Sequence, residues 1–138
     1  LITTDGGSII SAVDQRHTAS GISWKFRPTS TTRFVDYPLV LPIEAVAVKA
    51  NAQVTIKVWA RRDSTTIKGS LVIRGGQLNG IPNDVVVTVE PSINTWVLSD
   101  ALTFTPTEAG VVEVQFWVHD NVGTTNSFWI DDFQAEQA

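Results

Sequence analysis

The chain has 138 residues and a formal net charge of −4 at pH 7. This acidic balance argues against a nucleic-acid partner, because such a protein needs a basic face to neutralise phosphates. No apolar run approaches the ~20 residues that span a bilayer, so membrane insertion is not expected. The chain contains no cysteine for a disulfide and no methionine, even at position 1. We therefore expect it to be a piece of a longer protein or a processed one.

Strand signals follow one another along the chain, with Gly, Pro, Asn and Asp between them. The segment 43–52 contains good helix formers, but Val46, Val48 and its short length favour extended chain. In chain order, the predicted strands are Ser8–Val13, Gly21–Arg27, Tyr37–Val48, Gln53–Arg61, Lys68–Arg74, Asp84–Glu90, Trp96–Thr105, Val111–His119 and Ser127–Phe133.

Many short strands with regular turn signals predict an all-β sandwich or barrel. The length suits one domain. Residues 21–138 carry the strand pattern most clearly. Residues 1–20 are the least patterned, and we expect them to form an N-terminal arm or a first edge strand.

Alternation of apolar and polar residues assigns each strand a core face and an outer face. Three of the five tryptophans, Trp59, Trp117 and Trp129, fall on polar outer faces, whereas Trp24 and Trp96 fall with apolar neighbours and are expected in the core. An exposed indole leaves a large apolar area in water. It is therefore a candidate platform for a sugar ring or a partner protein. The alternative is that a loop, the N-terminal arm or residues 134–138 cover it.

Four segments carry a pattern of aromatic and polar residues: Ser20–Phe26, Val54–Arg61, Trp96 ahead of Leu102–Thr105, and Trp129–Phe133. Together they resemble the β-jelly-roll carbohydrate-binding modules. These modules occur beside glycoside hydrolases, and related domains occur in bacteriophage structural proteins. The resemblance covers most of residues 20–133 and implies two antiparallel sheets with jelly-roll topology. The turn at 106–112 also resembles phage virion domains.

Mapped onto the jelly roll, the resemblance implies two separate surfaces. Trp59 and Trp129 fall on adjacent strands of one outer face, which would pack against a partner or a neighbouring domain. Trp117 falls on the other sheet, where these modules often carry a glycan cleft. There it would stack on a sugar, whose hydroxyls would be bound by Gln115, Glu113, His119 and Arg74.

The resemblance also implies that one residue of the Asp131-Asp132 pair contributes to a structural Ca²⁺ site. Calcium takes six to eight oxygen ligands, and no EF-hand loop is present. A solvated carboxylate pair, or a pair bonded to backbone amides, is the alternative. His17 and His119 are the two histidines, and their separation suggests neither a zinc site nor a catalytic triad.

These observations predict a binding or attachment domain rather than an enzyme. The first hypothesis is that the chain is a glycan-binding domain within a larger virion or extracellular surface protein. The second is a structural or decoration domain of a phage particle, whose exposed tryptophans pack against other subunits or against copies of itself without binding sugar.

Overall fold

The computed structural model describes residues 2–4, 7–18, 21–28, 38–120 and 126–138, and these form β-strands and no helix. The strands are β1 (Ile2–Thr4), β2 (Gly7–Ala12), β3 (Ser23–Pro28), β4 (Leu39–Val48), β5 (Val54–Arg62), β6 (Ile67–Ile73), β7 (Val85–Val89), β8 (Val97–Leu98), β9 (Leu102–Phe104), β10 (Gly110–Asp120) and β11 (Phe128–Gln137).

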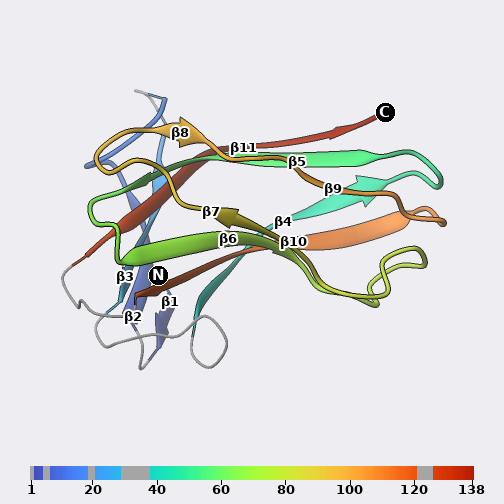
Figure 1. Ribbon diagram of the computed structural model, residues 1–138, viewed down its shortest axis with the longest axis horizontal. Coiled ribbons are helices and arrows are strands. Elements are labelled where there is room, and N and C mark those ends of the chain that lie inside the picture. Colours follow the sequence, from blue (N-terminus) through green and yellow to red (C-terminus); the bar gives the residue numbers. More distant parts are fainter. Residues whose placement is uncertain (1, 5–6, 19–20, 29–37, 121–125) are drawn as a thin grey trace.

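The strands form two antiparallel sheets that pack face to face as a sandwich (Figure 1). The larger sheet has the order β1-β2-β3-β11-β5-β8, and β9 also pairs with β5. The smaller sheet has the order β4-β10-β6-β7. Some neighbouring strands are distant in sequence, as in β3-β11-β5. The fold is thus the expected all-β sandwich of the jelly-roll type.

Apart from shifts of one or two residues at the strand ends, the structure departs from the predicted strands in three places. The segment 96–105 is two short strands, because Ser99 interrupts it: its backbone N–H donates to the Val58 carbonyl and its hydroxyl accepts the Val58 N–H. The last strand continues to Gln137 instead of ending at Phe133. A further strand, β1, pairs with β2 at the N-terminal edge. Tyr37, the expected first residue of the third strand, lies outside the described residues.

The core lies between the two sheets and follows the predicted alternation. Every second residue of β5 and β10 points into it, because a strand presents successive side chains to opposite faces. These inward residues are Val54, Ile56, Val58, Ala60, Val112, Val114, Phe116 and Val118.

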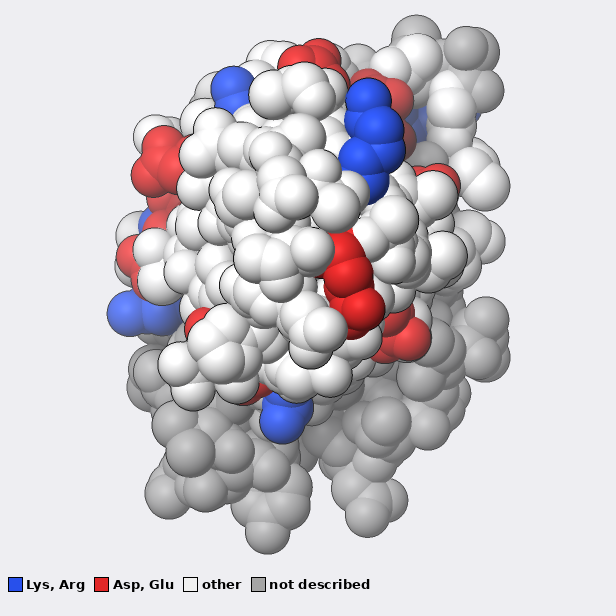
Figure 2. Space-filling model, turned by 90° about the vertical axis from the view of Figure 1, so that its right-hand side faces the viewer, with Lys and Arg blue, Asp and Glu red and all other residues white. Residues whose placement is uncertain are grey.

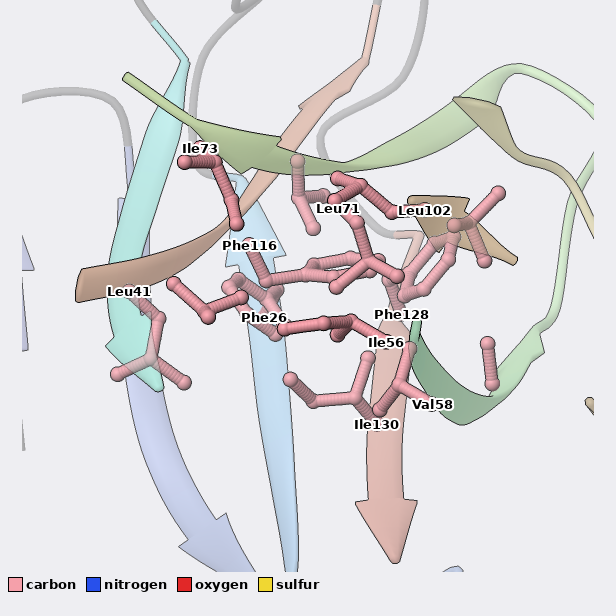
Figure 3. Packing of buried hydrophobic residues seen from close by; sticks show 14 of the residues in the cluster. Phe26, Leu41, Ile56, Val58, Leu71, Ile73, Leu102, Phe116, Phe128 and Ile130 are labelled. Carbon is pink, nitrogen blue, oxygen red and sulfur yellow. The ribbon is translucent and has the colours of Figure 1, made fainter. Parts of the chain in front are cut away.

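Three phenylalanines meet at the centre of the core, one from each of β3, β10 and β11 (Figure 3). The ring centroid of Phe116 lies 5.6 Å from that of Phe26 and 5.4 Å from that of Phe128. Gly69 in β6 leaves room for them, since a Cβ there would lie 2.7 Å from the Phe116 ring. This cluster joins the two sheets, because Phe116 belongs to one and the other two rings to the other.

Candidate functional site

The outer face of the smaller sheet brings four of the predicted ligand-binding residues together. We call Glu113, Gln115, Trp117 and Arg74 the Trp117 strip. The Trp117 indole N–H donates to Gln115 Oε1 (2.8 Å), and Gln115 Nε2 donates to Glu113 Oε1 (2.8 Å). The Arg74 guanidinium lies over the indole, 5.6 Å from the ring centroid. The strip is therefore ordered by its own contacts, and one face of its indole is covered.

His119, the fifth predicted residue, lies two positions beyond Trp117 on the same face. It pairs across the sheet with Lys68 and is half-buried. Burial lowers the pKa of the His119 imidazole, and the nearby Lys68 charge lowers it further. His119 therefore favours the neutral form, which can still donate and accept hydrogen bonds.

Trp129 occupies the expected outer face but is not exposed, so the predicted exposure was wrong. Its side chain is only 6% accessible, and its indole N–H donates to Asp14 Oδ1 (3.2 Å). Lys25 Nζ lies 5.1 Å from the ring centroid and 2.6 Å from Asp14 Oδ2. The ion pair of Lys25 and Asp14 covers the indole, so Trp129 presents no open apolar face to a partner.

Trp59 also points outward from β5 and is covered by the N-terminal segment. The His17 imidazole stacks on it with ring centroids 3.8 Å apart. The rings of Trp96 and His17 meet in a T-shaped arrangement, with ring centroids 5.9 Å apart. Trp96 was expected in the core and instead lies half-buried beside His17. The sheet pairings do confirm that β5 and β11, which carry Trp59 and Trp129, are adjacent.

The Asp131 and Asp132 carboxylates hold this segment in place. The backbone N–H of His17 donates to Asp131 Oδ2 (2.9 Å), and His17 Nδ1 lies 2.6 Å from Asp132 Oδ2. The Thr18 hydroxyl also donates to Asp132 Oδ2 (2.5 Å). Hydrogen bonds from Thr18 and then His17 lower the pKa of the Asp132 carboxyl.

These contacts bear on the predicted calcium site. Within the described ranges, no group of three or more His, Cys, Asp or Glu side chains is placed to hold a metal ion. Calcium takes six to eight oxygen ligands, and in this structure the Asp131 and Asp132 carboxylates accept hydrogen bonds from His17 and Thr18. Calcium binding at Asp131 and Asp132 therefore stays a prediction.

The largest departure from the sequence prediction concerns Trp24. It lies on the core-facing side of β3, two residues before the buried Phe26 and opposite the buried Ile130 of β11. It is nevertheless 37% exposed, and its neighbour Ile22 is 62% exposed. The smaller sheet therefore leaves this part of the inner face open, and Trp24 is not a core residue.

Trp24 lines a pocket of about 230 Å³ between the two sheets. We call this pocket, together with the adjoining one described below, the Trp24 groove. Val58 and Ile130, each 1% exposed, belong to the core beneath it. The residues that line this pocket are Ile22, Trp24, Ile43, Glu44, Val58, Ile130, Asp131, Asp132 and Phe133.

Two β-bulges border the groove from opposite sheets. In β4, the register shifts so that Pro42 pairs with Gln115 and Glu44 with Val114, which leaves Ile43 as the extra residue. In β11, the register shifts between Asp131 and Gln134, and Asp132 has a φ of 48° there. An extra residue bends a strand and redirects side chains, a device common beside binding sites. The bulges thus shape both walls of the groove.

The groove continues along β4 and β11. An adjoining pocket of about 320 Å³ shares Glu44 and Phe133 with the first and is otherwise lined by Ala45, Val46, Ala47 and Ala135. Alanines from both strands line this part of the groove. The two pockets of the groove therefore adjoin at Glu44 and Phe133, and Trp24 lines the first of them.

Sequence reasoning missed this groove because alternation reports the face of a strand and not what covers that face. Trp24 has the same inward direction as Phe26, but β4 is the edge strand of the smaller sheet. An available signal was the acidic Glu44, which interrupts the apolar run of β4 and pairs with the inward-facing Val114. A charged residue on a core-facing position indicates that the position is not enclosed.

Comparisons with known proteins support the fold. No protein-family model and no curated protein matches the chain. Among solved structures, a family 16 carbohydrate-binding module matches with a TM-score of 0.61 and 10% identity, covering 95% of this chain and 86% of that one. The CBM22-1 xylan-binding domain of Paenibacillus barcinonensis Xyn10C matches with a TM-score of 0.54 and 12% identity, covering 97% and 83%.

A phage protein shares the same architecture. The enzymatically active domain of bacteriophage CBA120 tailspike protein 4 matches with a TM-score of 0.64 and 16% identity, covering 98% of this chain but 18% of that one. At these identities the similarity concerns the fold. The chain is a β-sandwich with the fold of the carbohydrate-binding modules.

Proposed function

We propose that this protein is a non-catalytic carbohydrate-binding domain that holds a glycan in the Trp24 groove. The observation that carries the proposal is the half-exposed indole of Trp24 in an open groove between two sheets. The C–H face of a sugar ring can stack on such an indole, and the apolar contact removes the ring from water. The carboxylate of Glu44 on the same groove can accept hydrogen bonds from sugar hydroxyls.

The fold supports this assignment, since xylan-binding and other carbohydrate-binding modules share it. We further propose that the domain serves attachment within a larger virion or extracellular surface protein. The similarity to part of a phage tailspike is compatible with that setting. The charge distribution argues against a nucleic-acid partner. Figure 2 shows Lys and Arg scattered among acidic and uncharged residues on the visible face, without the basic patch that nucleic acid would require.

The Trp117 strip is a second candidate sugar surface, favoured by the convergence of Trp117, Gln115 and Glu113 with Arg74. A sugar would need to displace the Arg74 guanidinium from the indole. We therefore rank this surface below the Trp24 groove, whose indole is more exposed.

The test is titration calorimetry against a panel of soluble oligosaccharides with wild type, Trp24→Ala and Trp117→Ala. Loss of a stacking indole at the centre of a binding site typically weakens binding by about tenfold or more. We expect that loss in Trp24→Ala, with a circular dichroism spectrum like that of wild type, and little change in Trp117→Ala.

The opposite pattern would move the site to the Trp117 strip. Failure of wild type to bind any glycan on the panel, together with a concentration-dependent oligomer in light scattering, would favour the structural or decoration role.

A further inference from the structure

We infer that the Trp24 groove selects glycans that carry a protonated amino sugar over neutral or acidic ones. This inference rests on the proposed function, because it concerns the ligand of the same groove. It follows from which charged side chains line the groove and from where they point.

Among the described residues that line the two pockets of the groove there are carboxylates and no lysine or arginine. A glycan with uronic acids or sulfates would therefore place its negative charge against like charges, with no lysine or arginine among the described lining residues to compensate. Walls of low dielectric, such as the Val58 and Ile130 side chains beneath the first pocket, strengthen the field from the charges that remain. Acidic glycans are accordingly disfavoured.

Glu44 is the carboxylate best placed to attract a cation. Its pairing with the inward-facing Val114 directs it to the inner side of β4, yet its side chain is exposed. It forms no ion pair with another residue in the described part of the chain, whereas the Asp131 and Asp132 carboxylates are already bound to His17 and Thr18. Glu44 also lines both pockets, so an amine at either could reach it.

Trp24 adds a second, independent attraction. The face of an indole attracts a cation through its quadrupole and also binds apolar C–H groups. An amino sugar presents both features, a C–H face and an ammonium group at the ring edge. The indole and the Glu44 carboxylate on one groove therefore match an amino sugar better than a neutral one.

The experiment compares three oligosaccharides of equal length: glucosamine, N-acetylglucosamine and galacturonic acid. Each is titrated calorimetrically into wild type, Glu44→Gln, Trp24→Ala and the control Glu136→Gln at about pH 6, where an aliphatic amine is protonated. Glu136 is exposed on β11 and pairs with Thr55, away from the inner face. Its replacement therefore makes the same change in net charge outside the groove.

We expect wild type to bind the glucosamine oligomer about two- to fivefold more tightly than the acetylated one, the range of an exposed ion pair. Glu44→Gln should lose this preference, and Glu136→Gln should keep it. Added salt should reduce the preference in wild type, because it screens exposed charges.

Two results would overturn the inference. One is equal binding of the three oligomers by wild type, and the other is tightest binding of the acidic oligomer. In either case, binding that is lost in Trp24→Ala would leave the proposed function standing. A preference that survives in Glu44→Gln would also overturn it. Absence of binding by all three oligomers and by the wider panel would instead overturn the proposed function itself.

Discussion

The His17 imidazole stacks nearly flat on the Trp59 indole, with ring centroids 3.8 Å apart and 15° between the planes. This contact joins the segment after β2 to the outer face of β5. Asp131 and Asp132 hold the same histidine from β11. One residue therefore ties the N-terminal segment to two central strands of the larger sheet.

Replacing His17 with Ala should loosen that attachment. The stacked ring contact is worth about 1 kcal/mol, which corresponds to a decrease in melting temperature of about 3–5 °C for a domain of this size. Differential scanning calorimetry measures the decrease, and limited proteolysis should show faster cleavage before residue 21. Val13→Ala, at a side chain that is 61% exposed, is the matched control. An unchanged melting temperature in His17→Ala would contradict a stabilising role for the stack.

Acid should weaken the same attachment. The pKa of the Asp132 carboxyl in the folded protein is lowered from 3.8, because Thr18 and His17 donate hydrogen bonds to it. The unfolded state therefore binds the proton more readily, and this stabilisation is present above pH 3.8 and lost as the pH falls through the folded-state pKa. Thermal melts across the acid range should show a smaller dependence on pH in Asp132→Asn than in wild type. Parallel curves for the two proteins would contradict this origin.

Gly69→Ala should destabilise the core. A Cβ at this position would lie 2.7 Å from the Phe116 ring and 2.8 Å from the Phe128 ring, closer than real contacts allow. Overpacking of this kind costs about 1–3 kcal/mol, measurable as a lower midpoint in urea unfolding. Gly21→Ala is the control, because its Cβ would meet only the Thr18 residue at 3.4 Å or more. Equal midpoints for the two variants would mean that the phenylalanine cluster tolerates the methyl group.

Arg62→Lys should also be destabilising, although it keeps the charge. The Arg62 side chain is 8% exposed, and its guanidinium donates to the backbone carbonyls of Pro91 (2.6 Å) and Ile67 (3.1 Å). A lysine ammonium lacks the planar fork that reaches both carbonyls. A buried carbonyl left without its donor costs about 1–3 kcal/mol, to be checked by urea unfolding. Arg27→Lys, at an exposed position of β3, should change the midpoint little.

The local sequence pattern predicted most of the strands and the faces on which their residues lie. Strict alternation in β5 and β10 places Val58 and Phe116 inward and Trp59 and Trp117 outward, and the structure has all four on those faces. The reason is geometric: a strand has a period of two, so one correctly placed residue orients its neighbours. The regular turn signals predicted an all-β sandwich or barrel, and the resemblance to the carbohydrate-binding modules implied the jelly-roll topology.

The exposure of the tryptophans depended on the tertiary structure. Trp129 faces outward yet is buried, because the ion pair of Lys25 and Asp14 crosses it. Trp24 faces inward yet is open to solvent, because β4 is an edge strand and bulges at Ile43. Alternation along one strand fixes the side of the sheet on which a residue lies. Burial depends on what packs against that side, and these contacts join residues far apart in the chain.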